Sequence, residues 1–337
     1  MKTSKPLFSI IVPIYNVEKY ILKCIDSIIS QSFSDFELLI VDDESPDDSV
    51  ALINANFEDT RIKILSKKNG GLGDARNYGL RHAEGDYVWF LDSDDYTKDS
   101  DALLKLQKAI LKTKKQTEIL VFNMDVVFEN SDRSDYIVEN ASENTEMLTG
   151  FDYIDKYNVF PYNVPSQCYK KGFLVDNQFY FIRDLFFEDI YLNLDIYHKA
   201  RYVFGIKETL YTYNRRDNSI TGSQTNSKHL LSQAKVLAKV HKFYKDKLLP
   251  NKYLIDRIQI EYDRTKNFYR SFDKLIDSEL NVILKSIKIP TRKNETLTRK
   301  LEKLLFSLFP ILVLKNQFFF RKLNTLANLI KKNDCEK

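Results

Sequence analysis

The feature that most constrains the fold is an alternation of short apolar, β-rich runs with helical patterns over the first 115 residues. The expected strands are Leu7–Pro13, Phe36–Val41, Arg61–Leu65 and Tyr87–Leu91. The expected helices are Val17–Gln31, Asp47–Phe57, Leu72–Ala83 and Asp101–Lys115. Repeated strand-helix units predict a parallel sheet with right-handed crossovers, and the apolar strands indicate helices on both faces. We therefore expect an α/β fold in which ligands bind at the carboxyl ends of the strands.

The composition of the 337-residue chain argues against several other classes. Nine Gly and eight Pro are too few for a collagen-like, low-complexity or largely disordered protein. Cys24, Cys168 and Cys335 are far apart and the four histidines show no paired spacing, so we expect neither a disulfide framework nor a zinc site. We also expect no signal peptide and no run of the roughly 18 apolar residues that span a membrane. These features fit the reducing cytoplasm.

The alternation ends near residue 118. Ile119–Phe128 and Tyr136–Val138 are expected strands, and residues 147–222 are rich in aromatic side chains. Residues 227–285 have a helical pattern with little Gly or Pro. We predict one domain over residues 1–222, divided near residue 117, and a helical region over residues 223–337.

Two acidic segments follow predicted strands and are therefore expected at the carboxyl edge of the sheet. VDDESPDD places Asp42 and Asp43 after the second strand, where they either cap a helix or accept hydrogen bonds from a pyrimidine base or a ribose. FLDSDD places Asp92, Asp94 and Asp95 after the fourth strand. Three carboxylates within four residues repel each other, and a bound Mg²⁺ or Mn²⁺ would offset that cost. A lone DxD pattern also occurs in ordinary surface turns.

The segment NGGLGDARNYG joins the third strand to the next helix. Asn69 and Gly70 lie at the sheet edge, where glycine lets a ligand approach the backbone. Arg76 near the helix N-terminus adds positive potential for a phosphate. An ordinary glycine turn is the alternative. The segment is not GxGxxG and does not follow the first strand, which argues against a nicotinamide cofactor.

Two later segments carry further candidates. FFEDIY sets Glu188 and Asp189 among aromatic residues, where an apolar environment would raise a carboxylate pKa and suit general-base catalysis. An exposed acidic helix start is the alternative. Arg215 and Arg216 lie in LYTYNRRDNSIT, where they either close over a pyrophosphate or are ordinary surface arginines. We predict that Tyr211–Ser223 is a mobile lid.

The combination of these segments resembles a known family. PLFSIIVPIYN, IVDDESPDDS, NGGLGDARNYGL and GDYVWFLDSDDY, in this order over about 95 residues, are similar to the inverting family 2 glycosyltransferases with the GT-A fold. FFEDIY and the YxYxxRxxS-like ending are similar to the branch that builds bacterial capsular and other surface polysaccharides. The resemblance implies nucleotide-sugar binding by residues 1–117 and acceptor binding and catalysis by residues 118–222. Glu44 stands where the family often has Gly, and no His is clearly placed to complete a metal shell.

The resemblance also implies roles for single residues. Pro13 and Tyr15 would border the nucleotide base, and Asp42 or Asp43 would read it. Asp92 and Asp94 would hold the metal and the donor, with Asp94 the surer metal ligand. Asp189 would be the catalytic base, with Glu188 as a positioning group. The expected donor-binding residues are Pro13, Tyr15, Asn16, Asp42, Asp43, Asn69, Gly70, Arg76, Asp92, Arg215 and Arg216.

The implied activity is transfer of a hexose or N-acetylhexosamine from a nucleoside-diphosphate sugar, with UDP the expected nucleotide. The acceptor would be a hydroxyl of a growing, lipid-linked surface glycan, and Mn²⁺ or Mg²⁺ the cofactor. One alternative is a non-catalytic module that binds nucleotide sugar or membrane. A sugar nucleotidyltransferase is a weaker alternative, because it would need a Gly-rich phosphate loop after the first strand.

The charge distribution suggests a further partner. Residues 285–337 contain 13 Lys or Arg against 4 Asp or Glu, whereas residues 1–284 contain 38 against 43. Apolar residues with helical spacing accompany this excess, so we expect residues 285–332 to bind an anionic membrane surface at the inner face of the cell membrane rather than nucleic acid. Packing on its own domain, or on a second subunit of a homo-oligomer, is the alternative. The residues expected at the membrane are Lys300, Lys303, Phe306, Leu308, Phe309, Ile311, Leu312, Phe319, Arg321, Lys322, Leu323, Leu326 and Ile330.

Overall fold

In a computed structural model of the chain, the described residues are 5–129, 133–143, 146–159, 163–215, 227–246, 251–271, 278–290, 295, 297–308 and 313–314. The chain divides into two compact units, Met1–Ser223 and Gln224–Lys337. Within the described residues, none of the helices has the length and apolar character needed to cross a membrane.

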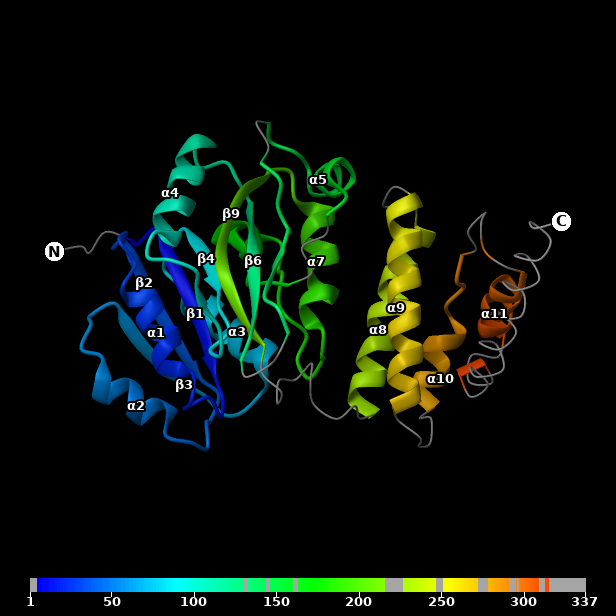
Figure 1. Cartoon of the computed structure of the whole chain (residues 1–337), viewed down its shortest axis with the longest axis horizontal. Coiled ribbons are helices and arrows are strands. Elements are labelled where there is room, and N and C mark those ends of the chain that lie inside the picture. Colours follow the sequence, from blue (N-terminus) through cyan, green and yellow to red (C-terminus); the bar gives the residue numbers. More distant parts are fainter. Residues whose placement is uncertain are drawn as a thin grey trace. The chain divides into compact units, whose positions relative to one another are not determined.

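The first unit is built on one mixed sheet (Figure 1). Its strands are β1 (Phe8–Ile14), β2 (Phe36–Asp42), β3 (Ile62–Ser66), β4 (Tyr87–Phe90), β5 (Tyr96–Thr97), β6 (Ile119–Phe128), β7 (Tyr136–Val138), β8 (Gln167–Lys170) and β9 (Val203–Arg215). Their order is β3-β2-β1-β4-β8-β6-β9-β5, and β7 pairs with β6 outside this path. The expected α/β fold is confirmed: β3, β2, β1 and β4 are parallel, and the antiparallel strand β8 follows β4.

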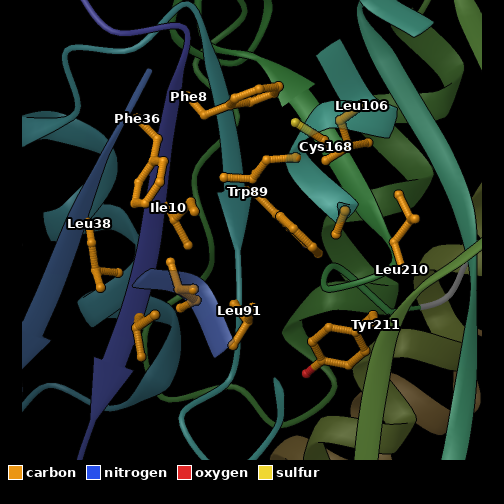
Figure 2. Packing of buried hydrophobic residues seen from close by; sticks show 14 of the residues in the cluster. Phe8, Ile10, Phe36, Leu38, Trp89, Leu91, Leu106, Cys168, Leu210 and Tyr211 are labelled. Carbon is orange, nitrogen blue, oxygen red and sulfur yellow. The ribbon is translucent and has the colours of Figure 1, made fainter. Parts of the chain in front are cut away.

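One face of this sheet is covered by α1 (Ile21–Ile29), α2 (Ser49–Asn56) and α4 (Ala102–Lys112). Because side chains alternate along a strand, every second residue of β1, β2 and β4 points into this layer. Figure 2 shows Ile10, Leu38 and Trp89 from three neighbouring strands in the same buried cluster as Leu106 of α4. The first helix begins later than expected from the sequence, because Val17–Tyr20 form a turn closed by the Tyr20 N–H and the Val17 carbonyl.

The opposite face carries α3 (Leu72–His82) and α7 (Glu188–Lys199). Gly79 lets α3 lie close to the sheet, since a Cβ at this position would come within 2.4 Å of Ile11 Cγ2. Two buried side-chain hydrogen bonds fix α7, from the Tyr169 hydroxyl to Asn193 at 3.2 Å and from the Tyr197 hydroxyl to Gln167 at 2.9 Å. Both helices are thereby held against the sheet. The remaining helices of this unit are α5 (Gly150–Tyr157) and α6 (Lys171–Asp176).

The second unit contains α8 (Ser227–Lys245), α9 (Asn251–Ser271), α10 (Ser278–Lys285) and α11 (Leu297–Leu308), so the helical character expected from the sequence is confirmed here. Its interior includes an aromatic contact between Tyr262 and Phe306, whose ring centroids lie 4.8 Å apart. The interior is also polar: Arg257 and Glu261 form an ion pair one turn apart on α9, and Gln233 of α8 donates to Glu261 at 2.6 Å.

The prediction that residues 285–332, the basic tail, bind a membrane surface is wrong for Lys303 and Phe306. Phe306 is fully buried against α9. Lys303 is 1% exposed, and its ammonium group donates to Glu295 at 2.5 Å and to the Pro290 carbonyl at 2.8 Å. These side chains pack within their own unit, because the apolar stripe and its paired cation fill its interior. The expected membrane residues outside the described residues are Phe309, Ile311, Leu312, Phe319, Arg321, Lys322, Leu323, Leu326 and Ile330.

Candidate active site

The candidate site lies where β1, β2 and β4 end. Ile14 and Asp42 are register partners at the ends of β1 and β2, and the Leu91 N–H donates to the Ile11 carbonyl beside them. Each strand is followed by one of the acidic or polar segments expected from the sequence. The N-terminus of α3 and the N-terminus of α7 complete the site from the opposite face of the sheet.

The loops after β1 and β2 are held together by side-chain hydrogen bonds. The Asn16 N–H donates to the Ser45 hydroxyl at 2.8 Å, and the Ser45 N–H donates to Asp42 Oδ1 at 2.9 Å. Glu44 has a left-handed backbone with φ +61°, a conformation that glycine adopts most easily, so this turn keeps a glycine-like shape without a glycine. Tyr15 is 51% exposed above this framework, whereas Pro13 is buried in β1.

The two aspartates after β2 have different environments. Asp42 is half-buried at the strand end. Asp43 is 3% exposed, and its carboxylate accepts from the Gly70 N–H at 3.0 Å, the Gly71 N–H at 2.8 Å and the Lys67 ammonium at 2.5 Å. The carboxylate therefore anchors the loop after β3. Asp42 is the better placed of the two to reach a ligand.

The expectation that the glycine segment lets a ligand approach its backbone stays a prediction, and the structure gives this segment a further role. The N–H groups of Gly70 and Gly71 already donate to Asp43, and Gly71 is needed for its left-handed φ of +82°. Asn69 is held nearby through its N–H, which donates to Glu44 at 3.2 Å. The buried Asp43 carboxylate therefore fixes the conformation of this turn.

The acidic loop after β4 divides its carboxylates between the interior and the surface. Asp95 is 1% exposed and accepts from the Tyr211 hydroxyl and, at 2.8 Å, from the Asn214 N–H. Burial raises the pKa of Asp95 well above its ordinary value, and the nearby charges of Asp94 and Asp92 raise it further. Asp92 and Asp94 are half-buried. Asp95 therefore fastens the loop to β9, whereas Asp92 and Asp94 stay partly exposed.

Arg76 of α3 joins the two acidic motifs. Its Nη2 donates to Asp92 Oδ1 at 2.5 Å and its Nη1 to Glu188 Oε1 at 2.6 Å, and its side chain is 3% exposed. Both terminal nitrogens of Arg76 pair with carboxylates, and its expected role in binding a phosphate stays a prediction. Segments that lie far apart in the sequence meet at this guanidinium.

Asp189 lies beside this bridge at the first turn of α7, where its Oδ1 accepts from the Ile190 N–H at 2.7 Å. Burial raises the pKa of Asp189 to about 7, the neighbouring Glu188 charge adds to the rise, and Arg76 opposes it. Burial likewise raises the pKa of Glu188, although Arg76 lowers it. A carboxylate with a pKa near neutrality is suited to accept a proton during catalysis.

The expected lid is only partly described. Tyr211–Arg215 form the end of β9, and Tyr211 is 1% exposed, so this part belongs to the sheet and the prediction of mobility there is wrong. The Arg215 guanidinium lies 5.7 Å from the centre of the Phe128 ring. Arg216 and the rest of the expected lid lie outside the described residues.

The carboxylates after β4 have the chemistry of a shared metal site. Among the described residues there is no group of three or more His, Cys, Asp or Glu that could hold an ion. Mg²⁺, however, is commonly bound by one or two carboxylates together with substrate phosphates. Asp94 and Asp92 supply hard oxygen donors, and so they fit a divalent ion shared with a diphosphate.

Three structural residues of the site were missed from the sequence. Lys67 pairs with both Asp43 and Asp74, at 2.5 and 2.7 Å. The Asn77 side chain binds both backbone groups of Phe181 across the site. The ARN sequence within the glycine segment was the available signal for Asn77, whereas no local pattern marks its partner Phe181.

Comparison with known proteins agrees with this geometry. Residues 9–168 match the family model described as glycosyl transferase family 2. Residues 9–168 therefore belong to glycosyl transferase family 2. Among its family 2 relatives is the uncharacterized glycosyltransferase EpsJ of Bacillus subtilis, 32% identical over 223 residues that cover 64% of this chain and 63% of EpsJ. A second is glycosyltransferase GlyA of Streptococcus pneumoniae, 33% identical over 63% of this chain and 31% of GlyA. The chain therefore spans less than two thirds of either protein.

Solved structures support the GT-A fold of this family 2 protein. The structure of residues 1–349 of Staphylococcus aureus TarS in complex with UDP-GlcNAc has a TM-score of 0.67 and 22% identity, covering 97% of this chain and 92% of that one. The mannosyltransferase PcManGT of Pyrobaculum calidifontis, in complex with GDP-Man and Mn²⁺, has a TM-score of 0.53 and 16% identity, covering 97% and 85%. At these identities the likeness shows the fold.

Proposed function

We propose that the protein is an inverting glycosyltransferase that moves a hexose or N-acetylhexosamine from a nucleoside-diphosphate sugar to a hydroxyl of a bacterial surface glycan. The observation that carries the proposal is the Arg76 bridge. It joins Asp92 of the DSDD segment to Glu188 of the ED segment, and so brings donor-side and acceptor-side carboxylates into one site. Membership of family 2 supports the reaction class.

Asp189 is the residue we assign to proton transfer. The acceptor hydroxyl loses its proton to the Asp189 carboxylate as its oxygen forms a bond to the anomeric carbon. The bond from that carbon to the diphosphate oxygen breaks on the opposite face, and its electron pair leaves with the nucleoside diphosphate. Glu188 stays paired with Arg76. Burial raises the pKa of Asp189 to about 7, with the Glu188 charge adding to the rise and Arg76 opposing it.

Tyr15 and Asp42 are the residues we assign to the nucleotide base, since one is exposed and the other half-buried at the ends of β1 and β2. Asp94 and Asp92 would hold Mn²⁺ or Mg²⁺ against the diphosphate. When bound, such an ion stabilises the negative charge of the leaving group. The Mn²⁺ complex of the archaeal mannosyltransferase supports a divalent ion as cofactor.

The donor and acceptor classes follow from the relatives. TarS, named as a poly(ribitol-phosphate) β-N-acetylglucosaminyltransferase, is 30% identical to this chain over 211 residues and has been solved with UDP-GlcNAc. The Pasteurella multocida chondroitin synthase is 29% identical over 307 residues. We therefore propose a UDP-sugar as donor and a polysaccharide or lipid-linked glycan as acceptor, at the cytoplasmic side of the cell membrane.

A donor screen tests the proposal. The full chain is incubated with a panel of UDP-, GDP- and dTDP-sugars, Mn²⁺ or Mg²⁺ and short glycan acceptors, and release of nucleoside diphosphate is measured with and without EDTA. We expect cation-dependent release with at least one donor, and NMR of the product should show an inverted anomeric configuration. Binding of a UDP-sugar by calorimetry without any release would instead support the non-catalytic nucleotide-sugar module.

We also propose that the end of the basic tail contacts an anionic membrane surface, now confined to residues 315–332. This stretch carries Arg321 and Lys322 beside Phe319 and Leu323 at helical spacing. Vesicles rich in phosphatidylglycerol should float the chain at low salt, and the double change Arg321→Glu with Lys322→Glu should release it. Equal flotation of both chains, or a salt-resistant dimer by light scattering, would favour a homo-oligomer contact instead.

A further inference from the structure

One face of α3 contacts the segment 178–188, which leads into α7. The three residues that make these contacts are Gly73, Arg76 and Asn77, spaced i, i+3 and i+4, so they share a face of the helix. Gly79 lies on a different face, against Ile11 of the sheet. The helix therefore has one side for the sheet and another for this segment.

Asn77 binds the segment as a neighbouring strand would. Its Nδ2 donates to the Phe181 carbonyl at 2.8 Å, and its Oδ1 accepts from the Phe181 N–H at 2.9 Å. Both bonds are buried, and Asn77 is 7% exposed. A single side chain thus satisfies both backbone groups of Phe181, which would otherwise be costly to bury.

Arg76 and Gly73 contact the same segment close to this bond pair. The Arg76 guanidinium lies 5.2 Å from the centre of the Phe181 ring as well as pairing with Glu188. Gly73 has no side chain where the segment passes, and a Cβ there would lie 3.0 Å from Phe181 Cβ and 3.2 Å from the Ile182 carbonyl oxygen. A Cβ at this point would require the segment to shift by a few tenths of an ångström, so glycine favours the close approach.

The segment itself has a backbone that needs outside support. Gln178, Asp184 and Phe187 adopt left-handed φ values of +56°, +58° and +60°. Residues other than glycine rarely adopt this backbone conformation. Phe187 directly precedes Glu188 and Asp189. The orientation of the first turn of α7 therefore depends on how firmly this segment is held.

We infer that Gly73 and Asn77, with Arg76, are positioning residues that hold segment 178–188 on α3 and so fix Asp189 relative to the carboxylates after β4. This inference rests on the proposed function, since it concerns the residue assigned as the base. The glycine-rich segment then has two structural roles. Gly70 and Gly71 donate to Asp43, and the residues that follow them on α3 hold segment 178–188.

Asn77→Ala tests the anchor directly. We expect faster amide hydrogen exchange across residues 178–188, a kcat lower by about 10- to 100-fold, and an unchanged dissociation constant for UDP with Mn²⁺, because small displacements of a catalytic group have such effects on turnover. Asn77→Asp, which keeps the acceptor for the Phe181 N–H, should recover part of the kcat. Asn56→Ala is the matched control, because the Asn56 side chain is exposed and, among the residues that the structure describes, donates only to the Leu52 carbonyl of its own helix.

Gly73→Ala provides a second test that removes no polar group. It should produce the same exchange and kcat changes as Asn77→Ala, whereas Gly172→Ala should not, because a Cβ at Gly172 meets only Asp176 Oδ2 at 3.7 Å. Unchanged exchange in 178–188, or increased exchange with wild-type kcat, would overturn the inference. If the wild-type chain transferred no sugar from any donor, the proposed function would fail, while the exchange result would still decide whether α3 holds the segment.

Discussion

The two units of the molecule each contain a buried arginine paired with a buried glutamate, but the pairs differ in construction. In the first unit, Arg76 joins Glu188 and Asp92 from distant parts of the chain, and the Asp92 side chain is 28% exposed. In the second, Arg257 and Glu261 lie one turn apart on α9, with side chains 2% and 0% exposed. The first pair borders a surface that a ligand can reach, whereas the second is sealed in a helical interior.

This difference separates two uses of buried charge. Carboxylates at the ends of strands keep a raised pKa or a partly exposed oxygen, which disfavours the folded state but suits binding and proton transfer. A fully buried ion pair such as Arg257 with Glu261 supports the folded state only while both partners are present. We therefore expect substitutions in the first site to lower activity with little loss of stability, and substitutions in the second to do the reverse.

The largest effect should follow from Asp94→Asn. Loss of a carboxylate from the expected cation site should lower transfer by about 10³-fold or more, since such an ion stabilises the leaving group by several kcal/mol. The melting temperature should stay the same or rise, because the change removes a negative charge close to Asp92 and Asp95. Initial rates with increasing Mn²⁺, and scanning calorimetry, check this result. Wild-type rates, or full activity in EDTA, would contradict it.

Asp189→Asn should lower kcat by roughly 10²–10⁴-fold, as expected for loss of a general base, with UDP affinity preserved. Asp184→Asn is the control, because Asp184 is an exposed carboxylate in the same segment. Single-turnover rates and calorimetric titration with UDP measure the two quantities. If turnover persisted in the Asp189→Asn variant while the donor still bound, the base would have to be another residue.

In the second unit, Arg257→Met should lower the free energy of unfolding by about 3–5 kcal/mol, because Glu261 loses its buried partner. Arg264 is a second partner of the Glu261 carboxylate, and its side chain is 45% exposed. Arg264→Gln should therefore lower the free energy of unfolding by at most about 1 kcal/mol. Urea unfolding followed by circular dichroism measures both values. UDP affinity should not change in either variant, and a parallel loss of affinity would contradict the separation of the two units.

The smallest effect is the pH dependence of catalysis. Burial and Glu188 raise the pKa of Asp189 to about 7, with Arg76 opposing and Asp92 adding to the rise. A base must be deprotonated, so kcat/KM should fall about tenfold per pH unit below pH 7 and level off above it. A profile that stays flat to pH 5 would exclude Asp189, with this environment, as the base.

The residues around the site show which of its features can be predicted from the sequence alone. The alternation of strands and helices placed Asp42, Asp92 and Asp94 at one edge of a parallel sheet, since the carboxyl ends of such strands meet there. It also marked Glu188 and Asp189 as a pair. Their catalytic and binding roles stay predictions until the experiments above are done.

The partners of these residues were decided only by the tertiary structure. Arg76 bridges Asp92 and Glu188, which the sequence did not predict, and Tyr211 was expected in a lid and instead lies in β9 against Asp95. Lys303 was expected at a membrane and is buried with Glu295. Local periodicity reports which face of an element is buried, but a contact between side chains a hundred residues apart depends on how whole elements pack, and no local pattern encodes that.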